Sequence, residues 1–143
     1  MQFYLNQRQV AQEEFEARAA EATDVRVENC AGLKTMPAMP KATDVRVENC
    51  AGLKTLPAMP KATDVRVENC AGLIIVVAGQ DSRGYTFKIV NGHGGPMVSA
   101  GCRHKTIEQA RQHWGVGGPS DRADCRALVE KLAAHIEKKR KAA

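Results

Sequence analysis

Apolar and charged residues alternate in three short segments of the chain. Residues 44–48 read Asp-Val-Arg-Val-Glu, and the same five residues recur at 24–28 and at 64–68. A period of two is typical of a β-strand with one buried face. The pattern therefore predicts three short strands, each with two valines on one face and three charged side chains on the other.

The three segments belong to a repeat of 20 residues. Residues 22–41 and 42–61 differ only at Met36 and Leu56, and a third copy is identical over 62–73. Copies this similar should adopt one conformation and stack on one another.

Each predicted strand is followed by residues that disfavour a helix. In the second copy these are Gly52, Pro57 and Pro60, and a Pro-x-x-Pro spacing favours an extended backbone. We therefore expect one strand and one extended return segment in every copy.

The repeat resembles a known family. Val45-x-Val47-x-x-Cys50-x-x-Leu53 is similar to the leucine-rich-repeat pattern, and residues 56–60, Leu-Pro-Ala-Met-Pro, are similar to a segment of the short repeats in secreted bacterial effectors. Residues 79–143 resemble the tail of small repeat proteins of phage and bacterial genomes. The resemblance implies a leucine-rich-repeat solenoid of phage or prophage origin. It does not extend to the ubiquitin-ligase domain of those effectors, because Cys102 and Cys125 lack its Cys-x-Asp motif.

The segments on either side of the repeats should cap the stack. Asn6 is a candidate N-cap for a helix over residues 7–22. Downstream, strands are expected at 73–78, 84–90 and 97–101, followed by a helix that opens with a capping box at Thr106 and a longer helix over 121–139 with an apolar stripe. The predicted fold is α+β, in three parts: an N-terminal strand or capping helix (1–21), a leucine-rich-repeat stack of parallel strands (22–73), and a β-meander with two helices (74–143).

Stacking would align equivalent side chains in columns. The valine, leucine and cysteine columns should be buried, whereas the charged columns should form an exposed face that binds a partner. The candidate binding residues on this face are Asp24, Arg26, Glu28, Asp44, Arg46, Glu48, Asp64, Arg66 and Glu68. We expect a protein partner, and a second copy of the chain is an alternative one.

Charge is unevenly distributed along the chain. Residues 1–79 carry 9 Lys and Arg against 10 Asp and Glu, whereas residues 80–143 carry 12 against 6. The alternative function is therefore a nucleic-acid-associated accessory protein that acts through a basic patch in its C-terminal half. That patch would comprise Arg103, Lys105, Arg111, Lys138, Lys139, Arg140 and Lys141.

Neither catalysis nor a bound cofactor is expected. Cys102 and His104 lie two residues apart, so on a strand their side chains would point to opposite faces. A column of cysteines presents thiols in a line rather than at the corners of a tetrahedron, which argues against a metal site. We expect a cytoplasmic protein with no membrane segment, because no signal peptide or long apolar run is visible and five cysteines suggest free thiols.

Overall fold

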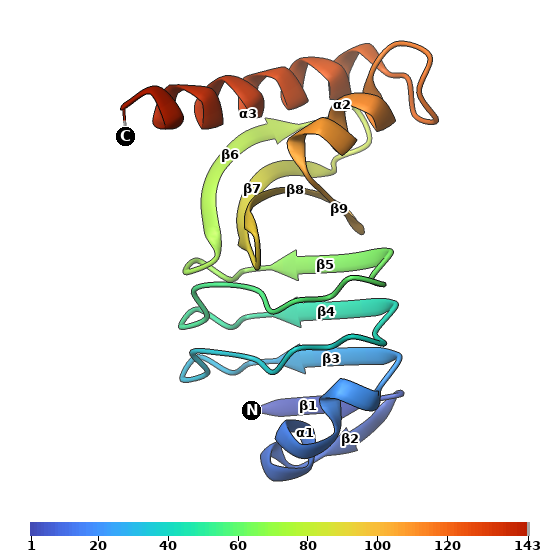
Figure 1. Cartoon of the computed structure of the whole chain (residues 1–143), viewed down its shortest axis with the longest axis vertical. Helices are drawn as coiled ribbons and strands as arrows, with labels where there is room; N and C mark the ends of the chain where they lie inside the picture. The colour runs from blue at the N-terminus through green and yellow to red at the C-terminus, as the bar shows by residue number, and fades with distance from the viewer. Residues whose placement is uncertain (143) are drawn as a thin grey trace.

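The computed structural model describes residues 1–142 and the side chains of residues 1–138, and it contains two β-sheets (Figure 1). The repeat sheet has five strands in the order β2 (Arg8–Val10), β1 (Gln2–Leu5), β3 (Asp24–Glu28), β4 (Asp44–Glu48) and β5 (Asp64–Glu68). The C-terminal sheet has four strands in the order β6 (Ile74–Gln80), β7 (Thr86–Gly92), β8 (Gly95–Ala100) and β9 (Arg103–Lys105). The helical segments are α1 (Gln12–Arg18), the short 3-10 turn Ala19–Glu21, α2 (Ile107–Trp114) and α3 (Ala123–Ala142).

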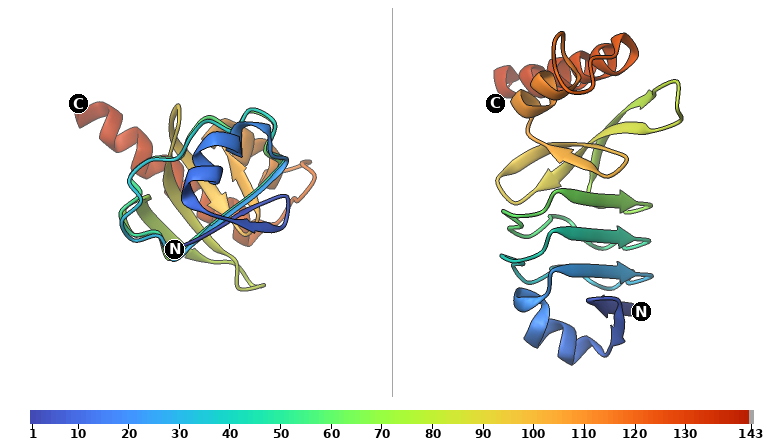
Figure 2. Two further views of the ribbon diagram at one scale, coloured as in Figure 1. Left: turned by 90° about the horizontal axis from the view of Figure 1, so that it is seen from below. Right: turned by 90° about the vertical axis from the view of Figure 1, so that its right-hand side faces the viewer.

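The three repeat strands are parallel and lie in register. Val45 pairs with Val25 on one side and with Val65 on the other, and the coils of the copies superpose when viewed along the stack (Figure 2). The predicted burial of the valine, leucine and cysteine columns is confirmed, since all of these side chains are between 0% and 8% exposed. Burial of this apolar surface stabilises the stack.

An asparagine ends every repeat strand. Asn29, Asn49 and Asn69 have φ values of 55°, 55° and 52°, a left-handed conformation that asparagine tolerates better than most residues. The Asn49 side-chain amide donates a hydrogen bond to Oδ1 of Asn29 at 3.0 Å. The asparagines therefore turn the chain out of the sheet and also link one copy to the next.

The helix predicted over residues 7–22 is present but shorter, because α1 spans Gln12–Arg18 and the 3-10 turn Ala19–Glu21 follows it. β1 and β2 form an antiparallel hairpin whose turn residues, Asn6 and Gln7, both have positive φ (51° and 69°). Oδ1 of Asn6 accepts hydrogen bonds from the backbone N–H groups of Thr23 (3.0 Å) and Asp24 (3.2 Å). Asn6 therefore fastens the hairpin to the first repeat instead of capping a helix, and α1 begins only at Gln12.

Most predicted elements of the C-terminal part are confirmed. β6, β7 and β8 lie within a few residues of the predicted strands, and Thr106 and Gln109 form the predicted capping box of α2. α3 begins two residues later than predicted and lies against the C-terminal sheet (Figure 1). Its apolar stripe is buried in the core that it shares with this sheet. β9 was not predicted from the sequence.

The predicted leucine-rich-repeat solenoid is wrong. The chain forms a mixed sheet and a separate antiparallel sheet, and no second sheet closes the repeat stack among residues 1–142. The N-terminal hairpin adds to the stack through antiparallel pairing of β1 with β3. At the other end, the third copy departs from the repeat at Ile74, where its return segment becomes β6 and pairs with β7. Only three strands are therefore parallel.

The C-terminal part covers the open edge of β5. The backbone N–H of Val65 donates to the Cys102 carbonyl at 2.8 Å, and the Lys88 ammonium donates to the Val67 carbonyl. Unpaired backbone groups on a sheet edge readily pair with another chain. These two hydrogen bonds satisfy part of that edge within the molecule.

Candidate functional site

The alternation within each repeat strand places its charged side chains on the side opposite the valines. Because the strands are in register, the aspartates, arginines and glutamates each form a column across β3, β4 and β5. All nine predicted binding residues therefore lie together on one face of the repeat sheet, although Glu28 is buried and not exposed as expected. We call these nine residues the strand face.

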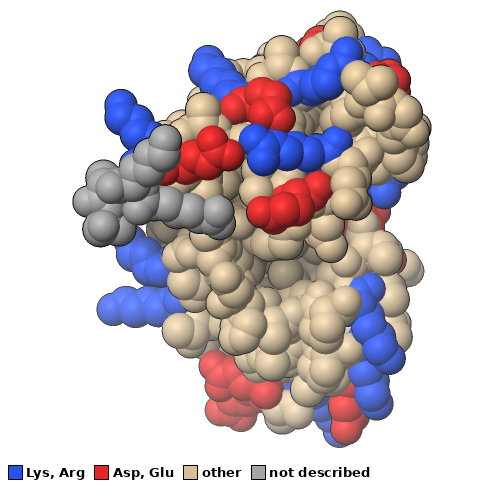
Figure 3. Space-filling view, turned by 45° about the horizontal axis from the view of Figure 1, so that its top comes forward, with Lys and Arg blue, Asp and Glu red and all other residues tan. Residues whose placement is uncertain are grey.

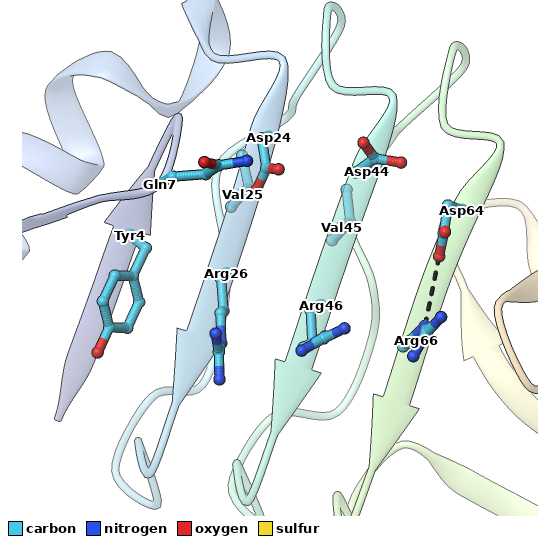
Figure 4. A pocket seen from close by; sticks show the side chains of 10 residues that line it. All are labelled: Tyr4, Gln7, Asp24, Val25, Arg26, Asp44, Val45, Arg46, Asp64 and Arg66. Atoms are coloured by element: carbon cyan, nitrogen blue, oxygen red, sulfur yellow. Dashed lines mark ion pairs between the residues drawn. The ribbon is translucent and has the colours of Figure 1, made fainter.

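A groove of about 530 Å³ runs along the aspartate and arginine columns (Figure 4). Its walls also include Tyr4 and Gln7 from the N-terminal hairpin, which the sequence analysis did not identify. The Arg26 guanidinium lies 5.4 Å from the centre of the Tyr4 ring, a cation–π distance. Tyr4 reaches this position because it pairs with Arg26 across β1 and β3.

Each arginine of the strand face pairs with a carboxylate of its own strand. Arg26 pairs with Glu28, Arg46 pairs with Glu48 at 3.7 Å, and Arg66 pairs with Asp64 at 3.6 Å. The two measured distances are longer than a hydrogen bond. The arginines are therefore held only loosely in the second and third copies.

Two aspartates of the strand face are without an ion pair. Among the described side chains, neither Asp24 nor Asp44 has a basic group within 4.0 Å. They are paired in register on neighbouring strands, so their carboxylates reinforce each other's negative potential. The strand face as a whole has six carboxylates and three guanidiniums. The face is therefore acidic, although it contains a complete arginine column.

Four of the seven residues of the alternative basic patch have described side chains, namely Arg103, Lys105, Arg111 and Lys138. Arg111 on α2 donates to Glu130 at 2.9 Å and to Glu137 at 3.3 Å on α3, and these bonds raise the pKa of the Arg111 guanidinium above its usual value. Figure 3 shows basic and acidic side chains interleaved over this helical end. Lys138 is exposed, whereas the side chains of Lys139, Arg140 and Lys141 lie outside the described residues.

Arg103 and Lys105 lie elsewhere, on β9. They line a hollow of about 420 Å³ together with His104 and His113. Neither cation forms an ion pair with a described side chain. The charges of Arg103 and Lys105 are therefore available to a ligand.

The cysteines of the repeats lie inside the protein. Burial raises the pKa of Cys50 to about 11 and also raises the pKa of Cys70, so both thiols stay protonated and unreactive near neutral pH. Cys102 and His104 line different hollows. This arrangement separates the Cys102 thiol from His104.

Asp81, Asp124 and Cys125 are the one group of potential metal ligands among the described residues, with ligand atoms within 4.8 Å of one another. The Arg83 guanidinium, however, donates to Oδ2 of Asp81 at 2.8 Å and to the Cys125 sulfur at 3.6 Å. A cation would have to compete with this guanidinium. The cluster instead links the β6–β7 turn to α3.

Comparison with protein-family models, with curated proteins and with solved structures found no match. None of the helices within residues 1–142 combines the length and the apolar character needed to cross a membrane. The function must therefore be argued from the strand face and its surroundings.

Proposed function

We propose that this protein is a non-enzymatic interaction module that binds a basic surface of a protein partner through the strand face. The proposal rests on Asp24 and Asp44, which lie in register on neighbouring strands in the groove of about 530 Å³. Neither carboxylate forms an ion pair with a described side chain. Lysine or arginine side chains of a partner would supply the charge that these carboxylates lack.

The surrounding geometry supports a binding role. The valines beneath the face are 0–2% exposed, so the strands that carry the charges are fixed by a packed core and need little ordering on binding. The loosely paired Arg46 and Arg66 can turn toward acidic groups of the same partner. Complementary charges of both signs fix the orientation of a partner more than they add affinity.

The proposed setting is the cytoplasm. All five cysteines are free, and four of them are buried. A reducing compartment would keep the exposed part of Cys102 from forming disulfides with other proteins.

Affinity capture with a matched control tests the proposal. The bait variant combines Asp24→Asn with Asp44→Asn, and the control combines Glu13→Gln with Glu16→Gln on α1, outside the groove. Both double variants lose two negative charges. We expect a partner retained by wild type and by the control to bind the Asp24/Asp44 variant about five- to tenfold more weakly, equivalent to about 1–1.4 kcal/mol. Equal retention by all three baits would contradict the proposal.

The same capture experiment distinguishes binding through the strand face from the alternative function, association with nucleic acid. Nucleic-acid association would weaken steeply with salt and would depend on the four basic residues 138–141. Neutralising those four residues should leave the strand-face partner bound. Loss of all binding in that variant would favour the nucleic-acid function instead.

A further inference from the structure

A second hollow lies where the repeat sheet meets the C-terminal part. It has a volume of about 350 Å³, within the range of small-molecule sites. Arg66 reaches it from β5, Arg83 from the β6–β7 turn and Arg103 from β9. We call this hollow the junction pocket.

The junction pocket carries excess positive charge. Three guanidiniums line it, and Glu68 is the one carboxylate among the described lining residues. Arg103 makes no ion pair with a described side chain, and Arg66 is 3.6 Å from Asp64. His113, on the same wall, has its pKa lowered first by burial and then by the charges of Lys105 and Arg103. Only the second, smaller contribution reflects the positive charges beside the pocket.

Arg83 is already held in position. Its guanidinium donates twice to Oδ2 of Asp81, at 3.0 Å and 2.8 Å, and lies 4.9 Å from the centre of the Tyr85 ring. The Arg83 side chain nevertheless remains 42% exposed. A ligand that contacts it would therefore not have to immobilise a free arginine side chain.

Apolar side chains form the inner wall. Phe87 and Trp114 are 0% and 3% exposed and meet edge to face, with ring centres 5.0 Å apart. An apolar wall lowers the local dielectric constant and strengthens the attraction between guanidiniums and an anion. Ser120 adds a hydroxyl group at the rim.

We propose that the junction pocket binds the phosphate group of a small phosphorylated molecule. A dianion with three terminal oxygens can accept hydrogen bonds from several guanidiniums at once, and guanidiniums suit phosphate because they donate in a planar fork. The Tyr85 ring, which also lines the pocket and is 48% exposed, would contact the organic part of the ligand. This site adjoins the proposed partner surface, because Arg66 and Glu68 of the strand face line it, and among the described residues Arg66 alone lines both hollows.

Titration calorimetry with three probes tests the proposal. The probes are inorganic phosphate, adenosine monophosphate and adenosine, so the phosphate group and the organic part are separated. We expect adenosine monophosphate to bind more tightly than phosphate and adenosine not to bind. If inorganic phosphate bound as tightly as adenosine monophosphate, the pocket would be a site for a free anion, and the proposed phosphorylated ligand would be wrong. Failure of both phosphate-bearing probes to bind at millimolar concentration would overturn the proposal.

The variants Arg103→Gln and Arg26→Gln locate the binding. Arg26 lines the strand-face groove but not the junction pocket, whereas Arg103 lines the pocket but not the groove. Arg103→Gln should weaken adenosine monophosphate binding at least tenfold, and Arg26→Gln should leave it unchanged. Amide chemical shifts should move at Gly101 and Ser120. Equal effects of the two variants, or shifts confined to other regions, would overturn the assignment without affecting the strand-face proposal.

Discussion

Asp81 and Arg83 form an ion pair in which the carboxylate is fully buried and the guanidinium is 42% exposed. Oδ2 of Asp81 accepts both guanidinium hydrogen bonds, while Oδ1 accepts the backbone N–H groups of Arg83 and Tyr85 at 2.9 Å and 3.1 Å. The Cys125 thiol lies 3.5 Å from Oδ2. The two residues therefore fix the β6–β7 turn and connect it to α3.

Asp81→Asn should destabilise the protein by about 3 kcal/mol, because it breaks a buried ion pair and replaces Oδ2 with an amide N–H donor that faces the Arg83 guanidinium. Burial alone would raise the pKa of Asp81, but hydrogen bonds from Arg83 and Tyr85 lower it below its usual 3.8. This stabilisation is therefore complete above pH 3.8 and is lost as the pH falls through the lowered pKa. Urea unfolding at pH 7 and pH 3 measures both effects. Asp64→Asn, on the exposed strand face, is the control and should change stability by less than about 0.5 kcal/mol.

The glycines of the repeats should respond differently to alanine, although their local sequences are identical. A Cβ at Gly72 would lie 2.5 Å from the Leu53 carbonyl oxygen and 2.7 Å from that of Ala51, whereas a Cβ at Gly32 would meet nothing within 4 Å. Gly72→Ala should therefore cost about 2 kcal/mol or more, since backbone must shift. Gly32→Ala should leave stability unchanged or slightly higher. Thermal unfolding of the two variants gives the comparison, and equal losses would contradict stacking of the third copy on the second.

The sequence predicted the parts of the fold that depend on local pattern. Alternation identified the repeat strands and their buried valines, and the Thr106 capping box identified the start of α2. The prediction failed at Asn6, because an asparagine suits both a helix N-cap and a turn with positive φ, and the structure has the turn. The leucine-rich-repeat solenoid predicted from the resemblance is wrong for another reason. The sequence of one copy does not indicate which elements flank a short stack at its two ends.

The candidate site was predicted only in part. The strand face follows from the repeat, because the copies align the same residues in register. The pairing of Arg111 with Glu130 joins residues 19 positions apart on separate helices, and no local pattern indicates it. The junction pocket likewise joins Arg66, Arg83 and Arg103 from three segments. Such juxtapositions depend on tertiary packing.

His104 should make stability fall in mild acid. Burial lowers the pKa of His104 from 6.5 to about 4, and its Nδ1 is buried without a hydrogen-bond partner among the described residues. The unfolded chain binds the proton near pH 6.5 and the folded chain only near pH 4. The free energy of unfolding therefore has its full value above pH 6.5. It falls by up to about 3 kcal/mol as the pH decreases toward 4, because the unfolded chain takes up the proton first.

Urea unfolding of His104→Gln between pH 7.5 and pH 4.5 isolates this contribution. The variant should lose less stability than wild type over that range. His93→Gln is the matched control, because His93 is exposed in the β7–β8 turn, and it should follow the wild-type curve. Parallel curves for all three proteins would show that His104 does not resist protonation.

The hydrogen bonds from Val65 to Cys102 and from Lys88 to Val67 also limit the addition of further strands to the repeat sheet. Identical coils can add to a stack without limit, because the last strand always presents a row of unpaired backbone N–H and C=O groups to which another strand can pair. The C-terminal part acts as a terminator at that edge. A tandem protein of this kind can therefore gain or lose a 20-residue unit without leaving the edge of its last repeat strand open to another chain.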